Sequence, residues 1–179
     1  MCPAGPADRG PAQEMHARCS ARTLGLRYHG PVADADRFLD HLLSPHFGHT
    51  LAARAADGRI VALGHLLWDG DDAEVALLVE DAWQRRGVGS EVLGRLASLA
   101  AQAGLEHVYA VTQPSNTGAV AVMRGLGLPL DHRIEPDPLK PTLVITARLT
   151  PPAPGVLVPA TGPYGSRALH GPVRHHGCG

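Results

Sequence analysis

The sequence predicts an α/β fold in which a mixed, mostly antiparallel sheet is flanked by helices. Three strand-like segments at 49–55, 60–68 and 73–80 follow one another with only tight turns between them. A long amphipathic helix occupies 88–103, and a strand, a helix and a last strand follow at 108–112, 116–126 and 143–149. Antiparallel strands followed by alternating strands and helices place the helices on the faces of one mixed sheet.

Short elements and turn residues support this order. A strand is expected at 23–28, and a helix at 34–43, where apolar residues recur at helical spacing. Pro45 ends that helix. The Asp57-Gly58 dipeptide is typical of a hairpin turn, and a second turn follows around Gly70.

Two helices have clear boundaries. The first has a continuous apolar face and is stopped by Gly104. The residues of that face are Val88, Val92, Leu96, Leu99 and Ala103. The second begins at Asn116, a residue type that caps helix N-termini well.

Composition separates the patterned region from both ends of the chain. Residues 1–20 and 151–179 are rich in Ala, Pro and Gly, without periodicity. Such segments bury too little apolar surface to offset the entropy of ordering. We therefore expect a disordered tail at 1–20, one domain at 21–150 and a second, Pro/Gly/His-rich disordered tail at 151–179. The histidines and Cys178 of the second tail do not complete a zinc-ligand spacing, so no metal site is predicted.

Charge and composition exclude several classes of partner. The formal net charge is −1 and no basic stripe is present, so neither nucleic acid nor a membrane surface is expected as a partner. No window approaches the ~18 apolar residues of a membrane helix, and the N-terminus lacks the apolar stretch of a signal peptide. Three cysteines without a C-x-x-C pair favour a reducing cytoplasm. No pattern predicts an oligomeric state.

The most informative segment lies between the strand at 73–80 and the following helix. It consists of Gln84, Arg85, Arg86, Gly87, Val88, Gly89 and Ser90. A helix N-terminus has unpaired N–H groups and partial positive charge, so it binds phosphate. The glycines let the backbone approach phosphate oxygens. The arginines add charge, and the serine adds a hydroxyl donor.

Two other glycine-loop motifs do not fit. A P-loop needs a Gly-Lys-Ser/Thr sequence, and no lysine follows these glycines. A dinucleotide-binding fingerprint needs a third glycine where Val92 stands. A strand-to-helix turn without a ligand is the remaining alternative, and the surrounding sequence decides against it.

That surrounding sequence resembles the GNAT acetyltransferases. The run from Gln84 to Gly89 is similar to their Q/R-x-x-G-x-G/A motif, and Val79-x-Asp81-x-Trp83 before it and Asn116-x-x-Ala119 after it fit the same family. The resemblance covers roughly residues 23–149. It implies a GNAT fold, splayed at the acetyl-CoA site, and direct transfer of an acetyl group from acetyl-CoA to an amine.

The resemblance also implies which residues hold acetyl-CoA. The backbone of Leu78 and Val79 would pair with the pantetheine arm, with the Val79 amide near the thioester carbonyl. The loop amides would bind the pyrophosphate, and Asn116 would contact the pantetheine arm. The predicted cofactor-binding residues are therefore Leu78, Val79, Gln84, Arg85, Arg86, Gly87, Val88, Gly89, Ser90 and Asn116.

Two carboxylates are candidates for the general base. A lysine amine has a pKa of about 10.4, so a base helps to deprotonate it. Glu74 resembles, by its place early on the central strand, the catalytic glutamate of bacterial protein-lysine acetyltransferases, and we predict it as the base, directly or through a water. Glu80 is the second candidate. Its alternative roles are a loop-edge residue or an ion pair with Arg85 or Arg86.

One position departs from the family pattern. Members often carry a tyrosine on the helix headed by the asparagine, where it protonates the leaving thiolate, and this chain has Met123 there. Methionine donates no proton. Transfer is still feasible because a thiol with a pKa near 8.5 leaves acceptably as a thiolate.

Three functional hypotheses follow. The first is an N-acetyltransferase that acts on a protein lysine. The second changes the acceptor to a small amine, such as an amino acid, an antibiotic or a polyamine, because acceptor specificity lies in the variable regions 29–48 and 127–141. The third, favoured by Met123, is a CoA-binding regulatory module with little catalysis.

Overall fold

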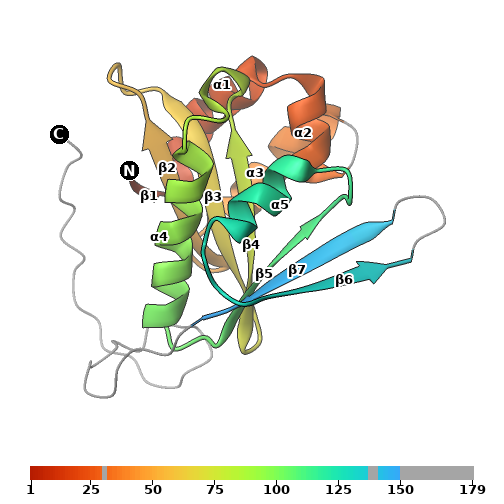
Figure 1. Cartoon of the computed structure of the whole chain (residues 1–179). Helices are drawn as coiled ribbons and strands as arrows, with labels where there is room; N and C mark the ends of the chain where they lie inside the picture. The colour runs from red at the N-terminus through yellow and green to blue at the C-terminus, as the bar shows by residue number, and fades with distance from the viewer. Residues whose placement is uncertain (30–31, 137–140, 150–179) are drawn as a thin grey trace, which may run out of the picture.

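A seven-stranded sheet with the strand order β1-β2-β3-β4-β5-β7-β6 organises the chain (Figure 1). This computed structural model describes residues 1–29, 32–136 and 141–149. The strands are β1 (Cys2–Ala4), β2 (Gly48–Arg54), β3 (Ile60–Asp69), β4 (Asp72–Val79), β5 (His107–Thr112), β6 (Leu130–Glu135) and β7 (Thr142–Arg148). The α-helices are α1 (Arg9–Arg18), α2 (Ala21–Tyr28), α3 (Leu39–Leu42), α4 (Val88–Gln102) and α5 (Thr117–Arg124). Three 3-10 helices are η1 (Pro6–Asp8), η2 (Val32–Phe38) and η3 (Asp81–Trp83).

The pairing of the strands confirms the predicted fold class. β4 and β5 run parallel, and the other neighbouring strands pair antiparallel. The sheet is therefore mixed and mostly antiparallel, and helices flank it as expected.

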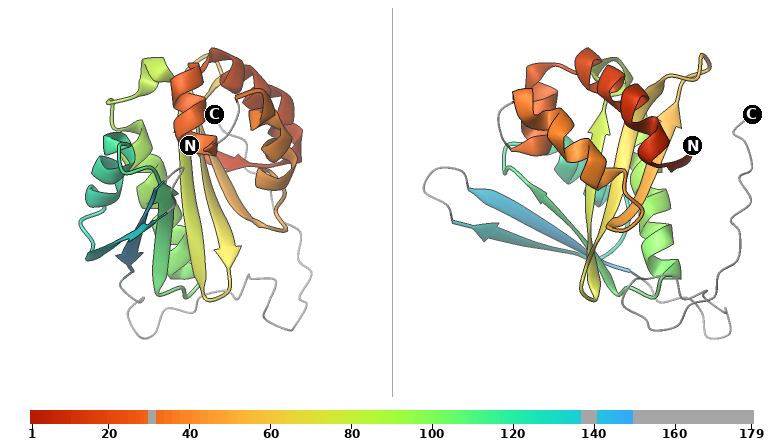
Figure 2. Two further views of the ribbon diagram at one scale, coloured as in Figure 1. Left: turned by 90° about the vertical axis from the view of Figure 1, so that its right-hand side faces the viewer. Right: turned by 180° about the vertical axis from the view of Figure 1, so that it is seen from behind.

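The two faces of the sheet carry separate layers of helices. Helix α4 packs on one face, and α1, α2 and α3 cover the opposite face of the β2–β4 region (Figure 2). Along β4, Val75 belongs to the α4 core with Val92 and Leu96, whereas Leu78 belongs to the core on the other face with Met15 and Leu24. Alternate residues of β4 thus face different helical layers, as the two-residue period of a strand requires.

The sheet divides in the middle. β4 pairs with β5 at Ala73↔Val108 and Glu74↔Tyr109, and the two strands then separate. β5 continues alongside β7, and the β5–β7–β6 part diverges from β4 (Figure 1). The side of β4 from Val75 to Val79 therefore has no neighbouring strand among the described residues, and we call this opening the β4–β5 split.

The N-terminal prediction is wrong. Residues 1–20 form β1, η1 and α1 instead of a disordered tail, and the strand expected at 23–28 is helix α2. Apolar contacts supply part of the reason, because Ala12 and Met15 are fully buried. Polar contacts with distant residues supply the rest: Arg9 pairs with Asp40 at 2.7 Å, and Arg18 pairs with Glu80 at 3.0 Å.

Three further segments were assigned a structure or a role from the sequence. The helix expected at 34–43 is divided between the 3-10 helix η2 and the short α-helix α3. Strand β6 lies in the region 127–141 that the sequence left as a variable loop. The tail predicted at 151–179 lies outside the described residues.

The packing of α4 on β3 generates a stability prediction. A Cβ added at Gly64 would lie 2.2 Å from Val92 Cγ1 and 3.0 Å from Leu96 Cδ1. Gly64→Ala should therefore lower the free energy of unfolding by about 1–3 kcal/mol, because overpacking strains a filled core. Urea denaturation followed by circular dichroism measures this change.

Gly94→Ala is the matched control. Gly94 lies inside α4 and a Cβ there meets nothing within 4 Å. This substitution should raise stability by about 0.5–1 kcal/mol, since alanine favours a helix interior over glycine. Equal effects of the two substitutions would contradict the close contact at Gly64.

Candidate active site at the split in the sheet

Two side chains hold the loop that leaves β4. The carboxylate of Asp81 accepts hydrogen bonds from the Ser20 backbone at 2.8 Å, the Ser20 hydroxyl at 2.7 Å and the Thr23 hydroxyl at 2.9 Å. The Gln84 amide donates to the Val79 carbonyl at 3.0 Å and to the Thr23 hydroxyl at 3.2 Å. The start of α2 therefore fixes the chain where it turns from β4 towards α4.

The backbone of this loop forms a concave set of donors. Arg85 has a φ of 58° and Gly87 a φ of 83°, both in the left-handed region. Alternation of such residues with right-handed ones turns successive N–H groups to one side and creates an anion-binding nest. The Glu91 amide donates to the Gly87 carbonyl at 3.0 Å as α4 begins. The N–H groups of Val88, Gly89 and Ser90 lie before that bond and lack an intrahelical partner.

The side chains of the loop leave this concave surface open. A Cβ at Gly87 would meet nothing within 4 Å. Arg85 and Arg86 are exposed, and the Arg86 guanidinium lies over the Trp83 ring at 5.5 Å from its centroid. Backbone donors, two cationic side chains and the N-terminus of α4 therefore suit a pyrophosphate.

The backbone of β4 presents its donors to the split at alternate residues. The Glu80 amide donates to the Val61 carbonyl at 2.9 Å, and the register places Leu78 opposite Leu63. In an antiparallel pair, alternate residues exchange hydrogen bonds with the partner strand. The backbone of Leu78 is therefore directed at β3. The N–H groups of Leu77 and Val79 are directed at the split.

Asn116 is positioned by its own hydrogen bonds. Its Oδ1 accepts from the Ala119 amide at 3.1 Å, which caps α5, and its Nδ2 donates to the Thr112 hydroxyl at 3.0 Å. One N–H and one lone pair of this amide remain for another partner. Met123 is 2% exposed and packs in the α4 core.

Glu80 has a structural partner. Its carboxylate accepts from Arg18 Nε at 3.0 Å, and Arg18 also donates to the Ile60 carbonyl at 2.7 Å. The buried Glu80 thus joins α1 to β3 and β4, and its partner is neither Arg85 nor Arg86. This pairing leaves Glu74 as the better candidate for a base.

Glu74 lies at the point where the sheet divides. It forms, with Tyr109, the last residue pair between β4 and β5. Burial raises the pKa of its carboxyl, nearby Arg27 lowers that pKa, and Asp69 raises it, with a raised value as the net result. The Tyr109 hydroxyl donates to Asp69 at 2.6 Å, so it is engaged beside Glu74.

Two polar residues near Glu74 were not predicted as site residues. Arg27, at the end of α2, and His65, on β3, each have a buried nitrogen without a hydrogen-bond partner among the described residues: Arg27 Nε and His65 Nε2. One sequence signal could have placed Arg27, because Ser20 caps α2 by accepting from the Thr23 amide at 3.2 Å. A Ser-x-x-Thr start predicts a helix and not the strand that we expected.

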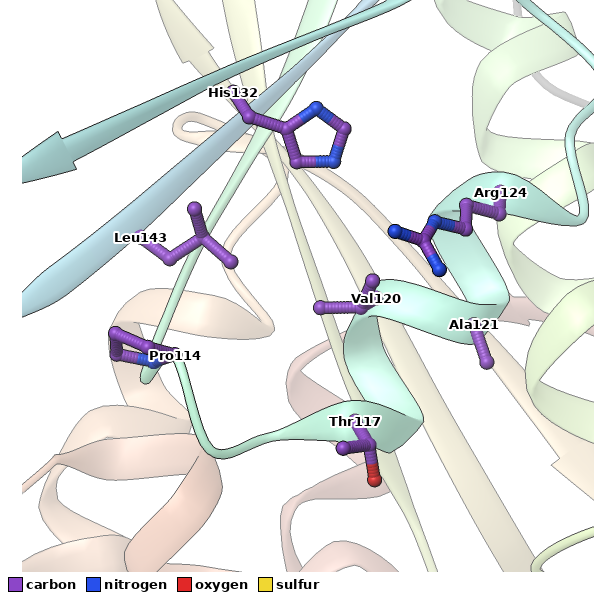
Figure 3. A pocket seen from close by; sticks show the side chains of 7 residues that line it. All are labelled: Pro114, Thr117, Val120, Ala121, Arg124, His132 and Leu143. Atoms are coloured by element: carbon purple, nitrogen blue, oxygen red, sulfur yellow. The ribbon is translucent and has the colours of Figure 1, made fainter.

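A separate pocket of about 380 Å³ opens between α5 and the β6–β7 hairpin (Figure 3). Its walls are mostly apolar, and the side chains of Arg124 and His132 lie on its rim. Its lining residues are Pro114, Thr117, Val120, Ala121, Arg124, His132 and Leu143. None of the predicted cofactor-binding residues lines this pocket.

The described residues lack two other kinds of site. No group of three or more His, Cys, Asp or Glu side chains is arranged to hold a metal ion. No described helix is long and apolar enough to cross a membrane.

Comparison with known proteins assigns the family. Residues 15–128 match the Acetyltransferase (GNAT) family. Among solved structures, the chain is similar to the GNAT domain of S. lividans PAT, with a TM-score of 0.69 and 24% identity over 83% of this chain and 89% of that chain.

Two other structures share the fold at lower identity. The ribosomal-protein-S18-alanine N-acetyltransferase from Escherichia coli has a TM-score of 0.66 and 15% identity over 87% of this chain and 97% of that chain. Spermidine N-acetyltransferase from Vibrio cholerae, solved with CoA and spermine, has a TM-score of 0.64 and 11% identity over 83% of this chain and 94% of that chain. The divided sheet and the family match together lead to one conclusion: the chain belongs to the GNAT family and is an acyl-CoA-dependent N-acetyltransferase.

Proposed function

We propose that this enzyme transfers the acetyl group of acetyl-CoA to a primary amine at the β4–β5 split, with Glu74 as the general base. The observation that carries the proposal is the place of Glu74 at the last residue pair before the strands separate. The unpaired backbone of β4 begins directly after it. A donor bound along that backbone therefore has its acyl end close to a half-buried carboxylate.

The donor side would use backbone amides that lack a hydrogen-bond partner among the described residues. The amides of Val88, Gly89 and Ser90 would bind the pyrophosphate, aided by Arg85 and Arg86. The N–H of Val79, the split-facing amide nearer the loop, would pair with the pantetheine arm, and the remaining N–H of Asn116 would reach the same arm. Gln84 would act by position, because its amide already holds the Val79 carbonyl.

The acceptor side would use Glu74. Its carboxylate takes a proton from the substrate ammonium, and the free amine attacks the thioester carbonyl. The new C–N bond forms and the C–S bond then breaks, with its electron pair leaving on the thiolate. The acylated nitrogen loses its second proton to water, which leaves the neutral amide. The Leu77 N–H, which lies nearer Glu74 along β4 than the Val79 N–H expected from the resemblance, would stabilise the negative charge on the carbonyl oxygen. The buried thioether of Met123 supplies no proton, so the thiolate leaves unprotonated.

Two classes of amine are candidates for the acceptor. A protein lysine is the acceptor that the resemblance of Glu74 favours, and a small amine is the alternative. The names of the structural neighbours include both a ribosomal protein and a polyamine, so the shared fold does not select between them. A CoA-binding module with little catalysis is the third hypothesis, and release of free thiol in the presence of an amine would reject it.

Ser90→Asp tests the phosphate loop. Ser90 is exposed in the first turn of α4. A carboxylate there should stabilise the helix by about 0.3–1 kcal/mol through the helix dipole. The same charge should repel the pyrophosphate and weaken acetyl-CoA binding by about tenfold or more, equivalent to about 1.4 kcal/mol. Calorimetric titration and thermal denaturation measure the two effects.

Ser90→Ala is the control, since it removes the hydroxyl without adding charge. It should bind acetyl-CoA within a few-fold of the unsubstituted protein. If Ser90→Asp bound acetyl-CoA with unchanged affinity, the pyrophosphate would have to lie elsewhere.

Glu74→Gln tests the base. The substitution should lower kcat/KM by about 10²–10⁴-fold, the usual contribution of a general base, and leave acetyl-CoA affinity unchanged. The carboxylate is the active form and burial raises its pKa, so kcat/KM of the unsubstituted enzyme should fall as the pH decreases through that raised pKa. Glu74→Gln should lack this step.

Glu106→Gln, which changes an exposed glutamate away from the split, is the matched control and should behave like the unsubstituted enzyme. Thiol release at several pH values with a panel of amines provides the data. Intact turnover of Glu74→Gln on every amine would show that another group acts as the base.

A further inference from the structure

A cation faces the proposed base from the neighbouring helix. Glu74, Ala76 and Leu78 point to the same side of β4, and Leu78 packs there with Leu24 of α2. Arg27 lies one turn after Leu24 and lowers the pKa of Glu74. The acceptor side of the split therefore contains a carboxylate and a guanidinium supplied by different elements.

The Arg27 guanidinium is not ion-paired within the described part of the chain. No ion pair or hydrogen bond joins it to Glu74 or to any other described residue, and its Nε is inaccessible to solvent. Its Cζ atom lies over the Tyr28 ring, 4.8 Å from the ring centroid. An enclosed cation without a carboxylate partner is costly, and burial accordingly lowers the pKa of Arg27. The residue as a whole is half-buried.

The helix that carries Arg27 is held firmly at both ends. Asp81 binds its start through Ser20 and Thr23. At its end, the Tyr28 hydroxyl bonds to His16 Nε2 at 3.0 Å, and His16 Nδ1 bonds to Asp36 at 2.7 Å. A guanidinium on a fixed helix is preorganised for a ligand, so little further ordering is required on binding.

His65 adds an unpaired acceptor on the same face. The Thr50 hydroxyl donates to the Leu42 carbonyl at 2.6 Å, so its oxygen accepts the second bond, at 2.9 Å, from His65 Nδ1. The proton of the neutral imidazole is thus on Nδ1, and Nε2 keeps a free lone pair. Register places His65 beside Ala76, whose small side chain separates Glu74 from Leu78 along β4.

We propose that Arg27 binds a carboxylate of the acceptor, so that the preferred substrate is a small amine that carries its own carboxylate, an amino acid. Glu74 would accept a proton from the ammonium while Arg27 neutralises the carboxylate, and the two protein charges match the two substrate charges. A lysine inside a protein has peptide bonds in place of that free carboxylate. This inference rests on the proposed role of Glu74 and identifies the substrate class for the same site.

Matched acceptors provide the test. We would measure thiol release with leucine, glutamate and lysine as acceptors. Each would be compared with its α-carboxamide, which lacks the negative charge, and with its decarboxylated amine, which lacks the whole group. A lysine in a peptide with blocked ends represents a protein acceptor. A charge-assisted hydrogen bond corresponds to a difference of about 10- to 100-fold, so free amino acids should exceed their amides by that factor in kcat/KM, mainly through KM.

Substitution of Arg27 assigns the preference to this residue. Arg27→Met should remove the difference between acids and amides. It should not lower the melting temperature, because replacing an unpaired buried charge by an apolar side chain of similar length is neutral or stabilising. Arg22→Met, on an exposed part of the same helix, should keep the full preference.

A binding measurement separates this inference from the proposed function. N-acetylated leucine should raise the melting temperature of the unsubstituted protein more than N-acetylated leucinamide does, and Arg27→Met should lose that difference. The role of Arg27 alone would be overturned if the enzyme acetylated amides or the peptide lysine as fast as free amino acids. It would also be overturned if Arg27→Met kept the preference for acids. Absence of thiol release with every acceptor would instead reject the proposed function, and the inference with it.

Discussion

The short junction between β4 and β5 is the constraint on which the rest of the site depends. Only the pairs Ala73↔Val108 and Glu74↔Tyr109 join these strands. Buried backbone N–H and C=O groups in proteins are almost always paired, and a central strand normally pairs on both sides. The second half of β4 instead keeps one side unpaired while α4 and α2 cover its two faces. That arrangement suits an extended ligand, which would supply the missing partner strand. A longer junction would close the split and remove the site.

The N-terminal segment completes this arrangement. Asp81 begins η3 and Gln84 follows its last residue, and both hydrogen bond to the start of α2. The bonds to Asp81 lower the pKa of its carboxyl, although desolvation acts in the opposite direction. The contact therefore stabilises the fold most at pH values where Asp81 is ionised, and it weakens as acid protonates the carboxylate. Helix α2 thus holds the loop that follows β4 and also carries Arg27, which lowers the pKa of Glu74.

Sequence reasoning located the parts of the molecule that depend on local pattern. The meander, α4, α5 and the phosphate loop each have a period, a turn or a cap that can be recognised within a few residues. α1 was missed because its order depends on ion pairs with distant residues, such as that between Arg18 and Glu80, and on only two fully buried apolar side chains, Ala12 and Met15. β6 was missed because its residues are largely exposed and backbone pairing with β7 holds it in place. Arg27 was missed for a similar reason: its role depends on which side of α2 faces β4.

The orientation of Glu74 is set at the other end of its strand. β3 and β4 are joined by a two-residue turn, Gly70-Asp71, between the paired residues Asp69 and Asp72. Gly70 has a φ of 61°, the left-handed conformation that such hairpin turns require. Because side chains alternate along a strand, a slip of one residue would move Glu74 into the α4 core and bring Val75 to the acceptor side. It would also turn the N–H of Val79 towards β3. A turn of two residues thus determines, at the same time, which side chains of β4 face α2 and which of its backbone amides face the β4–β5 split.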